Sequence, residues 1–222
     1  GAVTFTSEDG TPSLTVPYLG FYADWEQAPL FDDVPDGDYY ISPTRLVGAS
    51  TDYIGGNYLG MGFGGTYDYS KLAFSADYNG EGNRALALIP GLRRNATSLN
   101  LSVLDPAGSV MWESSYDRVP KNYFNTNSGG ITLLAVWEGW DGCLTDGTYA
   151  PEGPGYIYRL TGSVGQSQAK QTMDIPFFLD NTAPKATDFT LMEEDGRYLL
   201  EFLVQDNHYV NYIQLGDSTS QE

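Results

Sequence analysis

The sequence predicts an all-β protein built around a β-sandwich. Its 222 residues include 26 Gly and 12 Pro, and these interrupt the chain every few residues. The intervening segments are short, several of them alternate apolar and polar residues, and no long amphipathic helical pattern occurs. Many short strands between turns are typical of sandwiches. The hydrophobic content of 41% is enough for the packed core of one domain with flanking pieces.

The chain begins with a predicted hairpin. Residues 2–6 and 14–21 read as strands, and residues 7–10 form the turn between them. Pro17 places the second strand at a sheet edge or at a domain exit. Because the sequence starts inside a strand-like pattern, we expect residues 1–23 to be the terminal hairpin of a preceding domain.

Residues 22–70 are less regular and rich in tyrosine, which leaves two interpretations. The segment is either a folded aromatic cover over one sheet or a binding surface, since aromatic faces stack on sugars and anchor protein interfaces. The candidate binding residues are Tyr39, Tyr40, Tyr53, Tyr58, Tyr67 and Tyr69.

Regular strands return after residue 70 and complete a central domain over residues 24–184. The clearest strand is 98–104, where Leu99, Leu101 and Val103 share one face. The turn at 105–108 leads into its second arm, in which we expect Trp112 to be buried. Trp137, in the next predicted strand, is expected to be buried as well. The other predicted strands are 72–74, 85–89, 132–137, one beginning at 148, 156–163 and 172–179.

After a short linker at 180–184, residues 198–204 and 209–215 again read as strands. The segment 185–222 is too short for a complete Ig-like domain of about 100 residues. We therefore expect it to be the truncated start of a following module.

Composition excludes several function classes. A net charge of −18 disfavours nucleic acid and anionic lipid as partners, and no apolar run predicts membrane insertion. The single cysteine, Cys143, excludes an intramolecular disulfide, which fits an extracellular bacterial surface that does not depend on disulfides. His208 is the only histidine and lies in a turn-like stretch, and no G-x-S-x-G motif is present. We expect no catalytic residues and no organic cofactor.

One acidic loop has the spacing of a calcium site. Side-chain oxygens recur at every second position, at Asp77, Asn79, Glu81 and Asn83, with glycines that allow a tight turn. The position of the bidentate Glu of an EF-hand is occupied by Leu88. The alternative is a Gly-rich turn that binds no ion.

A series of motifs occurs in a defined order along the chain: Val16–Trp25, Ala28–Asp32, Tyr58–Gly60, Tyr67–Asp68, Leu72–Asn83, Arg94–Ala96, Val103–Trp112, Trp137–Gly142, Asp146–Tyr149 and Leu179–Pro184. This series resembles the accessory region of cell-envelope subtilisin-like serine proteases of the lactocepin and C5a-peptidase type. The match covers residues 2–184, and the order of the motifs is more specific than any one of them. Ala76 and Glu81 depart from the usual Pro and Asp of the family.

The resemblance implies a fibronectin-III-like sandwich between pieces of two neighbouring modules. The longer protein would be a secreted serine endopeptidase on a Gram-positive cell wall, with its catalytic domain outside this chain. The expected partners are that catalytic domain, neighbouring fibronectin-like domains and protein substrates. The competing hypotheses are a surface adhesin or a carbohydrate- or protein-binding module that uses the Tyr-rich 39–69 region, and a free-standing enzyme.

Overall fold

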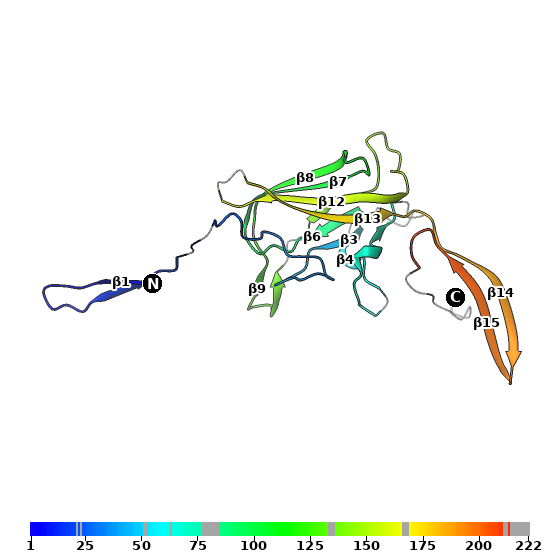
Figure 1. The fold of residues 1–222 in the computed structure, drawn as a ribbon, viewed down its shortest axis with the longest axis horizontal. Coiled ribbons are helices and arrows are strands. Elements are labelled where there is room, and N and C mark those ends of the chain that lie inside the picture. The colour runs from blue at the N-terminus through cyan, green and yellow to red at the C-terminus, as the bar shows by residue number, and fades with distance from the viewer. Residues whose placement is uncertain are drawn as a thin grey trace.

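A computed structural model of the chain describes residues 1–20, 22, 24–50, 53–62, 64–76, 85–132, 136–165, 169–210 and 213. Within these residues there is no α-helix, and a single 3-10 turn, η1 (Tyr69–Lys71), interrupts a series of strands. Two sheets pack against each other to form a sandwich (Figure 1). The predicted all-β sandwich is confirmed.

The larger sheet has five strands in the order β5-β13-β12-β7-β8. Its long strands alternate small or polar residues with bulky apolar ones, so that every second side chain points into the sandwich. All pairings are antiparallel except that of β5 with β13. The strands are β5 (Ala73–Phe74), β7 (Ala96–Leu104), β8 (Val110–Val119), β12 (Gly153–Ser163) and β13 (Gln171–Leu179).

The smaller sheet has four strands in the order β11-β6-β3-β4. Two of them, β3 and β4, lie within residues 22–70, which were expected to be less regular. This expectation is wrong for the residues of these two strands. The reason is that β3 is buried on both faces: Leu46 faces the main core, whereas Val47 belongs to a second cluster with Ala87 and Ile89. A strand covered on both faces does not alternate. The strands are β3 (Arg45–Ser50), β4 (Tyr53–Tyr58), β6 (Ala85–Ile89) and β11 (Val136–Trp140).

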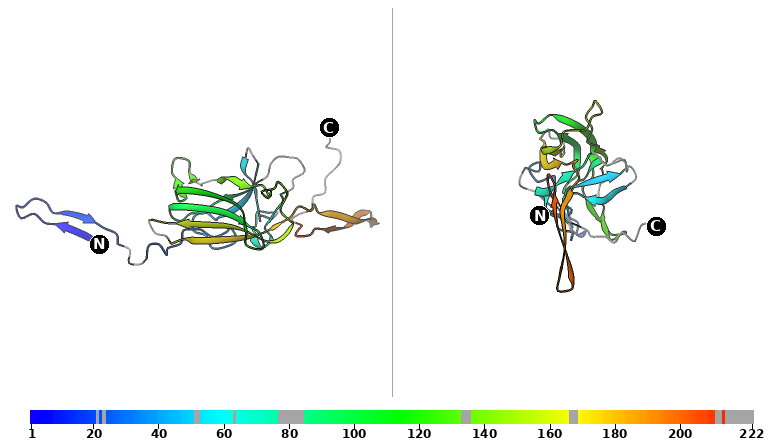
Figure 2. Two further views of the ribbon diagram at one scale, coloured as in Figure 1. Left: turned by 90° about the horizontal axis from the view of Figure 1, so that it is seen from above. Right: turned by 90° about the vertical axis from the view of Figure 1, so that its right-hand side faces the viewer.

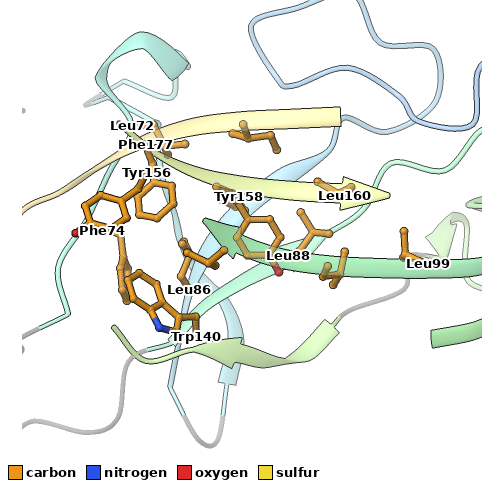
Figure 3. Packing of buried hydrophobic residues seen from close by; sticks show 14 of the residues in the cluster. Leu72, Phe74, Leu86, Leu88, Leu99, Trp140, Tyr156, Tyr158, Leu160 and Phe177 are labelled. Atoms are coloured by element: carbon orange, nitrogen blue, oxygen red, sulfur yellow. The ribbon is translucent and has the colours of Figure 1, made fainter. Parts of the chain in front are cut away.

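The main core fills the space between the inner faces of the two sheets (Figure 3). The predicted inward face of β7 is confirmed, because Leu99, Leu101 and Val103 are all buried. The residues that pack against this face of β7 come in part from the smaller sheet. The core residues of the two sheets include Leu46, Leu86, Leu88, Leu99, Leu101, Val103, Tyr158, Leu160, Ile175 and Phe177.

Trp140, which was not predicted from the sequence to be buried, is a buried tryptophan of this core. Trp140 is 1% exposed, and its ring centroid lies 6.2–6.4 Å from those of Phe74, Tyr156 and Phe177. Its indole Nε1 donates a hydrogen bond of 3.0 Å to the carbonyl of Cys143. Trp112, expected to be buried, is only partly buried, because it lies in β8 at the edge of the larger sheet. The side chain of Trp137 lies outside the described residues.

The glycines beside Trp140 explain the Trp-Glu-Gly-Trp-Asp-Gly motif in physical terms. A Cβ on Gly139 would lie 2.7 Å from the carbonyl oxygen of Leu86 on the neighbouring strand. Gly142 has a φ of +85°, and a Cβ there would overlap that of Ala76 at 2.0 Å. The chain can therefore pass this close to its neighbours only without side chains at these positions.

Three hairpins lie outside the two sheets, and in the described residues each pairs only with itself. The N-terminal and C-terminal hairpins project from opposite ends of the sandwich (Figures 1 and 2). Strand β14 was missed by the sequence analysis, whereas Tyr209 and Val210 do not continue a strand as predicted. The boundaries proposed at 23/24 and 184/185 stay predictions. The hairpins are β1 (Ala2–Phe5) with β2 (Leu14–Pro17), β9 (Tyr123–Asn125) with β10 (Gly130–Thr132), and β14 (Lys185–Glu194) with β15 (Arg197–Gln205).

The chain enters and leaves the sandwich at opposite ends of β13. At the first residue of this strand, the Gln171 side-chain amide donates to the carbonyls of Glu26 and Ala28, at 2.7 and 2.9 Å. Its amide oxygen accepts from the backbone N–H of Leu30 at 2.9 Å. At its last residue, Leu179, the chain turns out toward β14. A strand of this length spans roughly 26 Å, so the entering and leaving segments are held that far apart.

Candidate functional site

A groove of about 470 Å³ lies where the C-terminal segment meets the sandwich. One wall is the turn that follows β4 and leads into η1, and the other is the segment after β15. The lining combines aromatic rings, backbone and two oppositely charged side chains. The lining residues are Tyr58, Leu59, Gly60, Met61, Gly62, Thr66, Asp68, Lys71, Ala73, His208 and Tyr209.

Lys71 is fixed between the two walls of the groove. Its Nζ lies 3.0 Å from Asp68 Oδ2 and 4.4 Å from the centroid of the Tyr209 ring. The hydrogen bond and charge of the Asp68 carboxylate raise the pKa of Lys71. A cation over an aromatic face adds attraction to the hydrophobic contact. Lys71 therefore holds the C-terminal segment against the sandwich.

His208 serves the same docking contact. Its ring stacks on Phe178, with centroids 4.3 Å apart and planes 12° from parallel. Its Nε2 is 3.3 Å from the carbonyl oxygen of Lys71. The Asp206 carboxylate accepts hydrogen bonds from the backbone N–H groups of His208 and Tyr209, at 2.8 and 3.2 Å. The histidine is half-buried in this contact and faces a carbonyl, which is not a nucleophile.

Glu152 anchors the linker between the sandwich and β14. Its carboxylate accepts from the backbone N–H of Asn181 at 2.8 Å, from the Thr182 hydroxyl at 2.9 and 3.0 Å, and from the side-chain amide of Asn207. Burial, together with the nearby charges of Asp206 and Glu152, raises the pKa of Asp180 beside them. The linker is therefore tied to the sandwich by hydrogen bonds to a carboxylate.

The candidate tyrosines whose side chains the structure describes do not form one continuous surface. Tyr39 and Tyr40 are exposed, at 45% and 78%, and they are neighbours in sequence. Tyr58 and Tyr67 are half-buried, and Tyr58 lines the groove. Tyr69 is a core residue whose hydroxyl oxygen accepts a hydrogen bond of 3.1 Å from the backbone N–H of Leu46, so it is not available to a ligand. The side chain of Tyr53 lies outside the described residues.

The candidate calcium ligands Asp77, Asn79, Glu81 and Asn83 lie outside the described residues. Among those that are described, no group of three or more His, Cys, Asp or Glu side chains is placed to hold a metal ion. Cys143 is half-buried, and burial and the Asp141 carboxylate raise the pKa of its thiol. A raised pKa lowers the thiolate fraction and with it the reactivity of the sulfur.

A buried carboxylate that was not predicted from the sequence, Asp32, organises one end of the sandwich. Asp32 is 1% exposed and lies 2.7 Å from Arg93 Nε. Its carboxylate also accepts from the backbone N–H groups of Tyr40, Ile41 and Ser42, at 2.7, 2.9 and 3.3 Å. Burial alone would raise its pKa, but these donors outweigh burial and lower it. An aspartate in an acidic, turn-rich chain carries no sequence signal that separates it from solvated turn residues.

Comparison with known proteins gives a consistent class of relatives. The chain is 29% identical over 197 residues to a PI-type proteinase of Lactococcus lactis subsp. cremoris and to a PII-type proteinase of Lacticaseibacillus paracasei. The PIII-type proteinase of Lactococcus lactis subsp. cremoris strain SK11 is 29% identical over 196 residues. Each alignment covers 83% of this chain and 10% of the relative. No protein-family model matches the chain.

The chain is thus homologous to one segment of large bacterial proteinases and spans about a tenth of their length. In the part of the chain that is described, no helix is long and apolar enough to cross a membrane.

Proposed function

We propose that this chain is a non-catalytic accessory module of a secreted, subtilisin-like serine endopeptidase attached to a bacterial cell wall. The observation that carries the proposal is the alignment of 83% of the chain with 10% of proteinases from lactic acid bacteria. The sandwich would be of the fibronectin-III type, and the catalytic domain would belong to another part of the longer protein.

The geometry of β13 supports a spacer role. Because the chain enters at one end of this strand and leaves at the other, the sandwich would hold the modules before and after it roughly 26 Å apart. The contacts of Glu152, Lys71 and His208 would make the exit toward β14 stiff. A stiff spacer keeps a catalytic domain away from the wall and in a defined orientation toward protein substrates.

The test uses the longer proteinase with this segment present, deleted, or replaced by an unrelated sandwich of similar length. We expect all three to cleave a short chromogenic peptide at similar rates, and the deletion to slow the cleavage of a folded protein substrate on whole cells. The purified segment should hydrolyse neither casein nor peptides. Loss of short-peptide cleavage on replacement, or hydrolysis by the segment alone, would contradict the proposal.

A second candidate function is a glycan- or protein-binding module. The exposed rings of Tyr39 and Tyr40 favour it, together with the groove that Tyr58 and Tyr209 line. A glycan array probed with the wild-type segment and with a Tyr39→Ser/Tyr40→Ser variant tests this function. Specific binding that the variant loses would support it.

Calcium is part of the proposal as a ligand of the 77–83 loop, with a structural role. Asp77 and Glu81 are the only carboxylates among its four candidate ligands, so we expect weak binding, with a Kd of about 10⁻⁴–10⁻³ M. At tenfold excess over Kd the ion would add about 1–2 kcal/mol to the free energy of unfolding. Thermal unfolding in calcium and in EDTA measures this, and identical midpoints would contradict it.

A further inference from the structure

A cluster of basic side chains lies at the end of the sandwich where the chain enters. The pairing of Ala96 with Val119 brings the start of β7 beside the end of β8. The Asn95 side-chain oxygen accepts the backbone N–H of Lys121 at 2.9 Å, which ties the two segments together. This end is opposite to the one where β14 leaves, so the cluster is separate from the groove described above.

Two adjoining hollows, of about 330 and 310 Å³, open between these segments and share Asn95 and Gly165. Four of the 11 Lys and Arg residues of this acidic chain line them. The first hollow is lined by Trp25, Arg93, Arg94, Asn95, Lys121, Val164 and Gly165, and the second by Asn95, Ala96, Thr97, Arg118, Val119, Pro120 and Gly165.

The charges of these side chains are unequally compensated. Arg93 is neutralised by Asp32. Arg94 has no acidic partner among the described residues and is held in place by other contacts. Its Nη1 donates to the carbonyl of Ala28 at 2.9 Å, and its guanidinium lies 4.6 Å from the centroid of Trp25. Within the described residues, Arg94, Arg118 and Lys121 form no ion pair with a carboxylate. Three positive charges therefore gather here in a chain with a net charge of −18.

We propose that the two hollows bind a short acidic peptide segment of another polypeptide through its carboxylates. The planar guanidinium of Arg94 is already oriented, so it would lose little freedom on pairing with a carboxylate. Trp25, which is 60% exposed, offers apolar contact to the residues between the acids. The inference is independent of the association with a protease.

The surrounding charge decides between a short acidic segment and a long polyanion. At an ionic strength of 0.15 M, charges are screened beyond about 8 Å. A segment confined to the two hollows would contact Arg94, Arg118 and Lys121, and the acidic groups nearest to these hollows in sequence are Asp24, Glu26 and Asp117. A long phosphate polymer would extend over the acid-rich remainder of the molecule and be repelled. The ligand class is a peptide with two to four acidic residues and apolar residues between them.

The experiment is fluorescence anisotropy with a labelled octapeptide in which Glu and Leu alternate, titrated with the purified chain. We expect saturable binding at 0.15 M salt that weakens as salt is raised. The same peptide with Gln in place of Glu should bind at least about tenfold more weakly. Equal binding of the two peptides would mean an apolar contact and overturn the proposal, as would tighter binding of a polyphosphate of matched charge.

Lys121→Glu is the decisive variant, because Lys121 is exposed and its backbone has an ordinary conformation. Arg118 is less suitable, since its φ of +55° would change the strain of any replacement. The matched control is Arg197→Glu, the same change of charge at the tip of the β14–β15 hairpin. We expect Lys121→Glu to weaken binding about tenfold or more and the control less than about twofold.

Equal losses in the two variants would reduce the effect to net charge and overturn the proposal. Amide chemical-shift changes in the wild-type chain on peptide addition give a second readout that no substitution can disturb. They should centre on Asn95, Lys121 and Gly165, and shifts confined to other residues would contradict the site.

Discussion

Strand β12 of the sandwich and strand β14 of the C-terminal hairpin have similar lengths, 11 and 10 residues, and very different surroundings. In β12, Tyr156, Tyr158 and Leu160 are buried and alternate with half-exposed neighbours. In β14, all ten residues are exposed, although Phe189 and Leu191 are as apolar as the residues of the core. The contrast separates two steps of folding: local pattern and turns make a strand, but only a second layer buries it.

The difference predicts where stability resides. The free energy of unfolding should depend on contacts between the two sheets and hardly at all on the side chains of the hairpin. The exposed apolar side chains of the hairpin, such as Phe189 and Leu191, are instead accessible to a partner surface. Substitutions in the two regions test this division.

The largest effect is expected for Trp140→Ala. The ring is buried among Phe74, Tyr156 and Phe177, and its removal leaves a cavity, so the free energy of unfolding should fall by about 3–5 kcal/mol. Trp112→Ala is the matched control, since this ring is only partly buried and should cost clearly less. Chemical denaturation of the two variants measures both, and a larger loss in Trp112→Ala would contradict the assignment of the core.

The second largest effect is expected for Asp32→Ala. The free energy of unfolding should fall by about 2–4 kcal/mol, because three backbone N–H groups and Arg93 lose their hydrogen-bond acceptor. The lowered pKa of Asp32 also predicts how stability changes with pH. The carboxylate stabilises the fold fully when the pH is above its ordinary pKa of 3.8. This stabilisation is lost as the pH falls through the lower pKa of the folded state. Asp32→Asn should flatten the stability profile in this range. An unchanged profile would mean that the carboxylate contributes nothing there.

How much of this fold was predictable depends on how each strand is covered. Strands with one covered face alternate, so the arms of β7, β12 and β13 could be recognised from residues such as Leu99 and Leu101. Strands β3 and β6 are covered on both faces, and their short apolar runs fix neither their partners nor their layer. β6 was found because turn residues bound it, whereas β3 was missed among tyrosines and glycines.

The candidate sites show a similar limit. The sequence singled out tyrosines by composition, but burial assigns Tyr69 to the core and leaves Tyr39 and Tyr40 on the surface. The basic cluster could not be predicted, because Arg94 and Lys121 are 27 positions apart and meet only through the pairing of β7 with β8. Motif order indicated the class of relatives without indicating which residues meet in space.

A smaller effect, of opposite sign, is expected inside the core. The hydroxyl of Tyr158 is buried and has no hydrogen-bond partner in the described residues. Tyr158→Phe removes this unpaired group and should raise the free energy of unfolding by about 1 kcal/mol. Tyr156→Phe is the control, because the Tyr156 hydroxyl donates to the carbonyl of Pro151 at 2.5 Å and its loss should destabilise by about 1 kcal/mol. Stability changes of the same sign in the two variants would contradict the difference between these hydroxyls.

The smallest effect is expected for Leu191→Ala in the hairpin, where the side chain is 67% exposed. Little apolar surface is lost from contact, so the free energy of unfolding should change by less than about 0.5 kcal/mol. The same substitution at Leu160, which is 0% exposed, should cost about 2–5 kcal/mol.

Chemical denaturation at two protein concentrations distinguishes a stability change within one chain from a change in association between chains. A loss at Leu191 that grows with protein concentration would show that the hairpin is covered by a second copy of the chain. A loss above 1 kcal/mol at both concentrations would mean that the hairpin packs within its own chain, and the division between sandwich and hairpin would fail.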